Sequence, residues 1–369
     1  MTDMDSDPEG AGTEPNKRQR RPRVQRRVTM TDIAREAGCS QATVSFVLNQ
    51  TEGVKISADT RARVIEVARV LGYSPTSAGA FLRLPTAERT EGAIGFLVDQ
   101  LATSPEAAIA IDSARQEAWR SGKIVVTAQT QSDPVMEPRA IETLLSLGVS
   151  SMICMTIITR ELQPHPMLRT LAIPLVLLNC YTADQAFRSV IPGEIAGGQA
   201  ATNHLIKHGH RRIATILGEL WMDAASSRLE GYRRALATAD IPFDPDLVAQ
   251  GDWSTTGGYE ATRKLLALKH RPTAIFCQND RTALGCYDAI REAGLSIPGD
   301  ISVVGYDDEE ISRHLRPRLT TCVLPHRAMG RWAVEHLAEP MPRERKRHPI
   351  TKMECSLVQR ESVAPWRTP

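Results

Sequence analysis

Two residues near the amino-terminal end have side chains suited to reading DNA bases. Gln41 and Ala42 follow Ser40 in the stretch VTMTDIAREAGCSQATVSFVLN, residues 28–49, where a short helix is predicted to begin. A glutamine side chain can pair with adenine through two hydrogen bonds, and an alanine methyl group can contact the methyl group of thymine. We therefore expect these two side chains to face base edges in a DNA groove.

The surrounding residues predict two short helices joined by a tight turn. Thr29 and Asp32 have the spacing of a capping box, with Asp in place of the usual Glu. Gly38 is suited to end the first helix in a left-handed conformation, and Ser40 to cap the second. A third helix is predicted to begin after Ser57 and to bury one apolar face. That face comprises Val64, Ile65, Ala68 and Leu71. The first two helices form a helix–turn–helix pattern.

The charge of this region favours a DNA partner over an ordinary three-helix bundle. Residues 17–83 contain 13 Lys and Arg against 5 Asp and Glu, whereas the whole chain has a net charge of only +2. A basic surplus concentrated in a small helical unit is typical of nucleic-acid binding. Residues 1–27 are predicted to be a disordered arm, acidic first and then basic in KRQRRPRVQRR. The arm either adds phosphate contacts or is a solvated tail, and both interpretations stay open.

Length and composition indicate a globular protein of two or three domains. The chain has 369 residues, of which 42% are apolar and 24% charged. No apolar run reaches the roughly 18 residues that span a bilayer, and the acidic start MTDMDSDPEG does not resemble a secretory signal. The 7 cysteines have neither disulfide nor zinc spacing. We therefore expect a cytoplasmic protein with buried thiols and without a membrane partner, metal or cofactor.

From Gly92 onward, short apolar runs alternate with helical stretches. The runs are AIGFLV, KIVVTA, SSMICM and PLVLL, followed by RRIATIL, TAIFC and ISVVGY. Strands separated by helices of about 10–15 residues predict βαβ units and parallel sheets. Two such sets imply two doubly wound subdomains, with a ligand cleft at the carboxyl ends of their strands.

An enzyme and a free-standing solute-binding protein are the alternatives to a regulator. The chain has no GxGxxG after a strand, no P-loop, no GxSxG and no HExxH, so catalytic residues are not predicted. His204, His208 and His210 lie at a predicted helix end, where capping or solvated charge explains them. A solute-binding protein or sensor, whose basic helical unit would have another partner, is disfavoured because no export signal is recognised.

The chain resembles the lactose/galactose repressor family over about residues 28–365. MTDIAREAGCSQATVS and VKISADTRARVIEVARVLGYSP are similar to its DNA-binding headpiece, and HLIKHGHRRIATILG and FCQNDRTALGCYDAIREAGLSIPGDISVVGYDD to its effector domain. The resemblance implies an all-α headpiece (28–73), a hinge (74–86) and an α/β effector domain (90–365) with the fold of periplasmic sugar-binding proteins. The chain would cross between subdomains three times. The first subdomain would then hold residues 90–189 and 322–345, and the second 190–320 and 350–365.

The resemblance also implies which residues contact DNA. In the family, a Leu from each protomer's hinge enters the minor groove and bends the DNA; Leu82 matches it. Phe46 stands where the family usually has Arg, and we expect it to touch DNA or to turn into the core. Gly79 weakens the hinge helix by about 1 kcal/mol relative to Ala, and a plain flexible linker is the alternative. The implied DNA-binding residues are Thr29, Ser40, Gln41, Ala42, Thr43, Ser45, Phe46, Asn49, Leu82 and Arg83.

Four residues are expected to bind an effector. Arg228 in SSRLEGY and Asp280 in QNDRTALG match family residues that reach the ligand, although a surface or interdomain salt bridge and a helix N-cap are the respective alternatives. Trp253 in GDWS lies either at the edge of the cleft or in the core. For Trp221, core packing is expected. Glu106 in SPEA stands where members usually have an aromatic residue, so a ring-stacking ligand is not expected.

A second departure concerns the start of the second subdomain. The Asp that usually precedes its first helix is missing from IPGEIAGG. We expect a polar, non-aromatic effector, with a sugar or polyol first and an amine second. The resulting prediction is a repressor that binds a pseudo-palindromic operator as a homodimer and responds to this effector.

Overall fold

The computed structural model describes residues 28–48, 51, 56–71, 92–101, 105–338 and 347–366. The chain divides into two compact units, residues 1–83 and residues 84–369, and each is described by itself. The predicted arm (1–27) and hinge (74–86), with Asn49, Leu82 and Arg83, lie outside the described residues.

The first unit contains three helices, α1 (Met30–Ala37), α2 (Gln41–Leu48) and α3 (Ala58–Val70). The capping box at Thr29 is confirmed, because the Asp32 amide donates to Thr29 Oγ1 (3.4 Å) and the Thr29 amide to Asp32 Oδ2 (2.9 Å). Gly38 ends α1 with a left-handed φ of 62°. The Ser40 and Ser57 hydroxyls accept from the amides three residues on, at 3.1 and 3.2 Å. The sequence therefore specifies these helix ends locally.

Apolar residues from all three helices form the core of this unit: Ile33, Ala34, Ala37, Val44, Val47, Val64 and Ala68. Ile65 was expected in this core but is 51% exposed, so that expectation was wrong. Ile65 is the residue after Val64, so its side chain is turned about 100° around the helix axis from that of Val64. It therefore points away from the core that Val64 enters.

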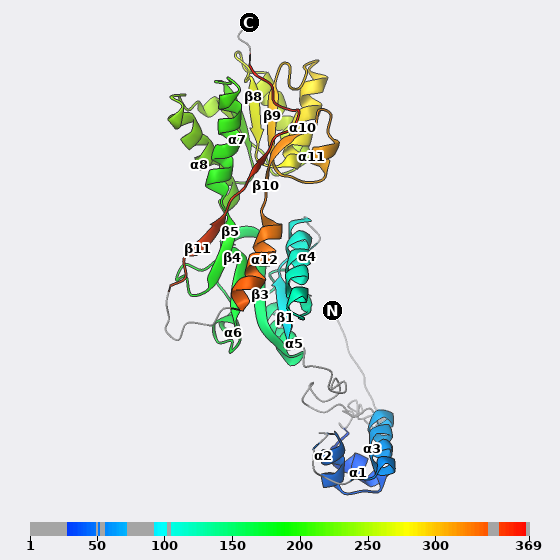
Figure 1. Cartoon of the computed structure of the whole chain (residues 1–369). Coiled ribbons are helices and arrows are strands. Elements are labelled where there is room, and N and C mark those ends of the chain that lie inside the picture. The colour runs from blue at the N-terminus through cyan, green and yellow to red at the C-terminus, as the bar shows by residue number, and fades with distance from the viewer. Residues whose placement is uncertain are drawn as a thin grey trace, which may run out of the picture. The chain divides into compact units, whose positions relative to one another are not determined.

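A six-stranded parallel sheet organises the first half of the second unit (Figure 1). Its strand order is β11-β5-β4-β3-β1-β2. Helices α4 and α12 cover one face, and α5 and α6 the other. The strands are β1 (Ala93–Val98), β2 (Val125–Gln129), β3 (Val149–Glu161), β4 (Leu175–Tyr181), β5 (Arg188–Pro192) and β11 (Ile350–Met353). The helices are α4 (Pro105–Arg120), α5 (Met136–Ser146), α6 (Pro166–Arg169) and α12 (His326–Leu337).

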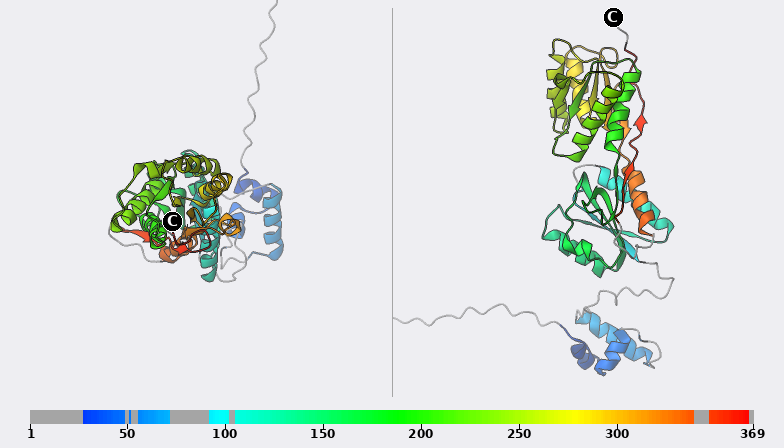
Figure 2. Two further views of the ribbon diagram at one scale, coloured as in Figure 1. Left: turned by 90° about the horizontal axis from the view of Figure 1, so that it is seen from above. Right: turned by 90° about the vertical axis from the view of Figure 1, so that its left-hand side faces the viewer.

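A second six-stranded sheet has the order β12-β10-β9-β8-β6-β7 and is parallel except for β12 (Figure 2). Helices α7 and α8 cover one face, and α9 and α10 the other. The strands are β6 (Ile213–Leu217), β7 (Val248–Gln250), β8 (Ala274–Cys277), β9 (Ser302–Asp307), β10 (Thr320–Val323) and β12 (Leu357–Val358). The helices are α7 (Glu194–Lys207), α8 (Asp223–Thr238), α9 (Thr255–Leu266), α10 (Asp280–Glu292) and α11 (Ile311–His314), with a short 3₁₀ helix at Pro245–Leu247.

Both faces of each sheet are covered by helices, so the predicted pair of doubly wound subdomains is confirmed. The chain passes between the sheets after β5, after β10 and after β11. The boundaries expected at residues 190, 322 and 350 fall within or at the start of these strands. The chain leaves each sheet a few residues later than expected because each strand first completes its backbone pairing. Residues 350–353 therefore belong to the first subdomain and not to the second.

Cys39 is half-buried and the other six cysteines are buried, all as free thiols. Within the described residues, every helix is too short or too polar to cross a membrane.

Candidate DNA-reading surface and effector site

The second helix of the first unit presents the residues expected to read DNA. Val44 and Val47 are buried, whereas Gln41, Ala42 and Phe46 on the other side of α2 are exposed. Ala42 and Phe46 are four residues apart and thus adjacent on the helix surface. The face of α2 that points away from the core is therefore accessible to a DNA groove.

Phe46 has 37% of its surface exposed, so the alternative in which it turns into the core was wrong. An exposed aromatic ring between two buried valines offers an apolar contact, such as one to a thymine methyl.

The carboxyl end of α1 is held by a residue that the sequence analysis missed. Arg63 of α3 donates from Nε to the carbonyl of Ala37 at 3.0 Å. A cation at a helix carboxyl end satisfies a free carbonyl and interacts favourably with the helix dipole. This bond fixes α1, and with it the turn into α2, against the third helix.

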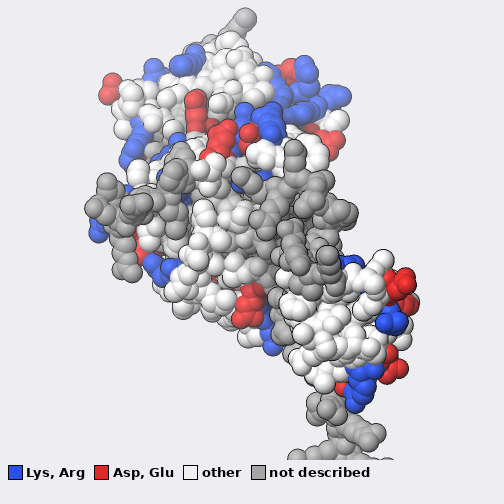
Figure 3. All heavy atoms as spheres, turned by 60° about the horizontal axis from the view of Figure 1, so that its bottom comes forward, with Lys and Arg blue, Asp and Glu red and all other residues white. Residues whose placement is uncertain are grey.

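The basic surplus of residues 17–83 comes mostly from their first part. Seven of the 13 Lys and Arg lie in residues 17–27, outside the described residues. On the face drawn in Figure 3, both basic and acidic side chains are present among the described residues, with wide areas of other residues between them. Phosphate attraction is therefore expected to depend strongly on the segment before α1.

In the second unit, side chains from the two subdomains meet where strands of both sheets end. The Tyr181 hydroxyl, at the end of β4, donates to Asp223 Oδ2 of the other subdomain at 2.9 Å. Carboxylate oxygens of Glu106, Asp307 and Glu309 also come within 4.8 Å of one another. We call this region the inter-sheet junction.

Arg228 lies at the junction, but its guanidinium group is already occupied. Glu194 accepts from Arg228 Nε at 2.8 Å and from Nη2 at 3.0 Å, and Nη1 donates to the Gln278 carbonyl. The residue is 3% exposed, and its guanidinium carbon lies 3.7 Å from the centre of the Tyr306 ring. The structure therefore contains a salt bridge, but not the surface or interdomain one offered as the alternative. The pair is buried and joins two helices of one subdomain.

Glu194, the first residue of α7, is the acidic partner that the sequence analysis missed. The stretch IPGEIAGG had been noted only for lacking an Asp before the helix. An acidic residue in the first turn of a helix was the available signal. Glu194 accepts both hydrogen bonds of the Nε–Nη2 edge of Arg228, so this edge is not open to a ligand. Effector binding by Arg228 remains a prediction.

Asp280 is fully buried and accepts hydrogen bonds from Thr321 Oγ1 (2.7 Å) and the Glu309 amide (2.8 Å). Burial raises its pKa to about 8. The N-cap of α10 is Asn279, whose side chain accepts from the Thr282 amide at 2.9 Å. The capping alternative for Asp280 was therefore wrong by one residue. Asp280 instead ties α10 to the segment that follows β9.

The two tryptophans differ from each other in exposure. Trp253 is half-buried, packs over Gly218, and donates from Nε1 to Met222 Sδ at 3.1 Å. Its ring centre is 5.5 Å from the Arg228 guanidinium carbon, which places it beside the junction. Trp221 is 69% exposed, so the expectation of core packing was wrong. It lies on the turn between β6 and α8.

Glu106, the second residue of α4, is 9% exposed. Its Oε2 atom is buried and has no hydrogen-bond partner among the described residues. Glu309 pairs with Arg281 Nε at 3.0 Å, and Asp307 Oδ1 is 3.5 Å from Arg228 Nη1. Burial raises the pKa of Asp307 well above its usual range and also raises that of Glu309. The junction thus holds carboxyl groups that resist ionisation.

The clustered histidines His204, His208 and His210 lie outside this site, and the contacts of His208 and His210 are structural. His208 Nδ1 lies 2.8 Å from the His204 carbonyl, which agrees with the predicted capping role. His210 is buried, and its Nδ1 and Nε2 atoms lie 2.9 Å from Thr273 Oγ1 and 3.0 Å from Ser302 Oγ. It is therefore not a solvated charge, as had been expected, but links three segments of the second subdomain.

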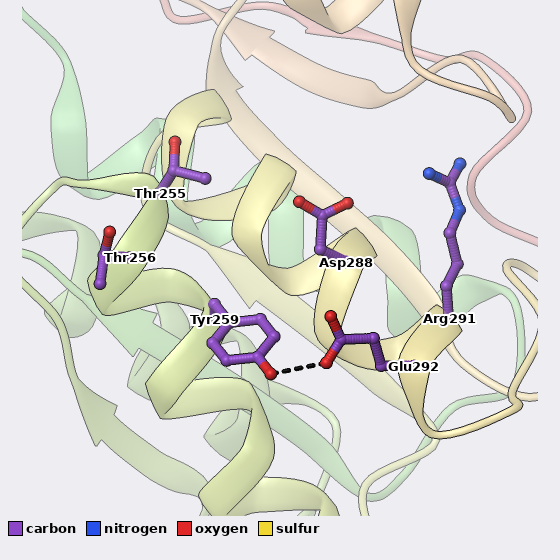
Figure 4. A pocket seen from close by; sticks show the side chains of 6 residues that line it. All are labelled: Thr255, Thr256, Tyr259, Asp288, Arg291 and Glu292. Atoms are coloured by element: carbon purple, nitrogen blue, oxygen red, sulfur yellow. Dashed lines mark hydrogen bonds between the residues drawn. The ribbon is translucent and has the colours of Figure 1, made fainter.

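A separate hollow lies between α9 and α10 (Figure 4). It is lined by Thr255, Thr256, Tyr259, Asp288, Arg291 and Glu292. Tyr259 donates to Glu292 Oε2 at 2.6 Å, so two of its polar groups already satisfy each other. The junction is the better candidate site because it brings buried carboxylates together from both subdomains.

Comparison with known proteins assigns the chain to a family. Residues 29–76 match the profile of bacterial regulatory proteins of the lacI family, and residues 202–363 match a periplasmic binding protein-like domain. The chain is 32% identical over 335 residues to the ribose operon repressor of Haemophilus influenzae, covering 91% of this chain and 98% of that protein. The chain belongs to the lacI family of bacterial regulatory proteins. It is thus a DNA-binding transcriptional regulator, as the sequence analysis predicted.

Other relatives of this lacI-family regulator are similar over the same length. It is 33% identical over 336 residues to the HTH-type transcriptional repressor PurR of Pasteurella multocida, covering 91% of this chain and 98% of PurR. A complex of the transcriptional regulator CelR with cellobiose has a TM-score of 0.62 at 29% identity, covering 91% of this chain and all of the other. The lac repressor dimer bound to operator and the anti-inducer ONPF has a TM-score of 0.63 at 28% identity, covering 92% and 100%. These matches confirm the predicted fold over nearly the whole chain.

Proposed function

We propose that this lacI-family regulator represses transcription by binding a pseudo-palindromic operator as a homodimer, and that a small polar effector at the inter-sheet junction changes its affinity for DNA. The observation that carries the proposal is the exposed face of α2, where Gln41, Ala42 and Phe46 stand clear of a core made by all three helices. The relatives support it, since they include named repressors and a dimer on operator DNA.

Base reading would then divide between polar and apolar contacts. Gln41 is suited to adenine, and Ala42 and Phe46 to thymine methyl groups. Thr29, Ser40 and Thr43 would contribute phosphate contacts through hydroxyl or amide groups at helix starts, and Ser45 through its hydroxyl group within α2. Asn49, Leu82 and Arg83 keep their proposed DNA roles by resemblance to the family alone.

Operator selection from random duplexes tests this proposal. We expect the full chain to enrich a sequence with two-fold symmetry and A·T pairs at the positions facing α2, and to run as a dimer in sizing experiments. Enrichment of a single asymmetric half-site by a monomer would contradict the homodimer, and no enrichment at all would contradict sequence-specific repression. Because a bacterial regulator meets its operator DNA in the cytoplasm, we propose that the protein is cytoplasmic and associated with the nucleoid.

The effector is proposed to lie among Glu106, Arg228, Trp253 and Asp280, at or beside the junction. Relatives complexed with cellobiose and with ribose support a sugar or polyol, and the buried carboxyl groups support a ligand that donates hydrogen bonds. A thermal-shift screen of sugars, polyols, sugar acids, amines and nucleosides tests the class, because a ligand of the folded state raises the melting temperature. Stabilisation by nucleosides alone would contradict a non-aromatic effector.

A further inference from the structure

The inter-sheet junction has more carboxylates than cations. Glu194 and Asp307 share Arg228, and Glu309 pairs with Arg281. Within the described part of the chain, Glu106 has no ion pair. The carboxyl groups of Glu106, Glu194, Asp307 and Glu309 thus have two guanidinium partners among the described residues, those of Arg228 and Arg281. Like charges brought together in a poorly solvated site raise one another's free energy unless a cation joins them.

Glu106 supplies a separate indication that a partner belongs here. The residue is nine-tenths buried, and its Oε2 atom meets no donor among the described residues. A buried carboxylate oxygen without a donor is unfavourable, because the hydrogen bonds it made to water are lost. A ligand that brings a donor to this oxygen would recover them.

The spacing of the three carboxylates fits a single nitrogen. Their oxygens lie within 4.8 Å of one another, so a single atom can lie within about 2.8 Å of all three. An ammonium nitrogen and a carboxylate oxygen form hydrogen bonds of about 2.7–2.9 Å, which such a position allows. A primary ammonium group has three N–H donors, one for each carboxylate. A calcium ion takes about 6–8 oxygen ligands, so it would also need the second oxygens of these carboxylates or bound water.

We infer that the effector of this regulator carries a primary ammonium group, held between Glu106 on one subdomain and Asp307 and Glu309 on the other. This inference rests on the proposed function, because it specifies the chemical class of the same effector. It reverses the order expected from the sequence, in which a neutral sugar or polyol came first. A hydroxyl group can also donate to a carboxyl group, but only an ammonium group brings the positive charge that favours the ionised form of these carboxyl groups.

A matched pair of small probes tests the inference on the full chain. At pH 7, ethanolamine has an ammonium group at the position where ethylene glycol has its second hydroxyl group. At 50 mM and pH 7, we expect ethanolamine hydrochloride to raise the melting temperature of the effector domain by about 1–3 °C over equal potassium chloride, and ethylene glycol to leave it unchanged. Glu106→Gln keeps the shape of the side chain and should abolish the rise. Glu142→Gln, at an exposed position of α5, should retain it.

Each other result overturns the inference. Equal stabilisation by ethylene glycol would indicate a neutral hydroxyl site, and an equal rise in Glu106→Gln would place the ammonium elsewhere. Stabilisation by 1 mM calcium chloride that Glu106→Gln removes, without a response to ethanolamine, would indicate a metal site. No rise with any probe would show that the junction does not take a cation. Operator binding, followed by fluorescence anisotropy on the same preparations, separates this failure from failure of the proposed function.

Discussion

The polar residues of the headpiece and those of the inter-sheet junction differ in exposure and in hydrogen bonding. On α2, Gln41 and its neighbours are exposed and available, and the residues that hold the helix are its own cap and core. At the junction, Arg228 and Asp280 are buried and bound to other side chains of the same subdomain. A DNA-reading surface can be built from one helix, whereas a ligand site between two sheets also has to hold those sheets in place.

The largest expected effect follows from breaking the buried pair at the junction. Glu194→Ala leaves the Arg228 charge buried without its bidentate partner, so we expect the effector domain to lose about 3–5 kcal/mol of unfolding free energy. Urea unfolding of the full chain measures the loss. Glu142→Ala is the control and should change stability by less than about 0.5 kcal/mol.

A double variant sharpens this result. Arg228→Ala alone should also be strongly destabilising, and Glu194→Ala with Arg228→Ala together should cost less than the sum, because neither member of the pair is left without the other. Additive losses would mean that the two residues do not act as a pair. A stable Arg228→Ala variant that has lost its effector response would instead restore Arg228 as a ligand-binding residue.

The second effect concerns specificity on the headpiece. Phe46→Arg places a bidentate donor on the exposed face of α2, which should favour guanine at one symmetric operator position by about 1–3 kcal/mol. Operator selection with both proteins measures the change. Ile65→Arg adds the same charge at another exposed position and should leave the preferred sequence unaltered. Identical preferences for Phe46→Arg and the parent chain would remove Phe46 from the DNA interface.

The third effect is a pH dependence that the headpiece should lack. Burial raises the pKa of Asp280 to about 8, above its value in the unfolded chain, so the folded state binds an extra proton at neutral pH. That stabilisation is complete at low pH and is lost as the pH rises toward 8. Burial lowers the pKa of His326 to about 4, and its opposite contribution is complete above about pH 7.

Between pH 7 and 8, the stability of the effector domain should therefore fall, by at most about 1.4 kcal/mol per pH unit for each proton released. Asp280→Asn should reduce the slope, while Asp307, Glu309 and Arg281 near it remain. Thermal melts in buffers of equal ionic strength measure it. A slope that Asp280→Asn leaves unchanged would show that another group titrates.

The smallest effect tests whether the headpiece is held by local capping. Ser40→Ala removes the acceptor for the Thr43 amide at the start of α2 and should cost about 1 kcal/mol of headpiece stability. The unfolding of an isolated domain of residues 17–83 is followed by circular dichroism. Ser40→Asp retains a cap and is the matched control. Equal stability of all three would mean that the core alone positions α2.

The sequence could predict whatever depends on neighbours in the chain. The capping box of Thr29, the left-handed Gly38 and the apolar strands are set by spacings of a few residues, and the structure contains them. Family resemblance added the order of the two subdomains. Glu106 was selected because it replaces an aromatic residue, and it does lie at the junction with two other carboxylates.

Pairings between distant elements could not be predicted in this way. Glu194 meets Arg228 only because α7 packs against α8, and nothing in IPGEIAGG specifies that contact. Asn279 and Asp280 are adjacent and both suited to capping, so the one-residue error reflects two equal candidates. Core packing was expected for Trp221 because it lies near a strand end, but on the turn after that strand its side chain is exposed.

The crossing strands also constrain how the protein is made. β11, an edge strand of the first sheet, leaves the ribosome only after nearly all of the second subdomain has been synthesised. Until residues 350–353 arrive, one side of β5 presents unpaired backbone groups, which are a template for pairing with other chains. β12 arrives last and closes β10 in the same way. The nascent chain therefore has two incomplete sheets late in translation, and a truncation before residue 350 leaves both edges open.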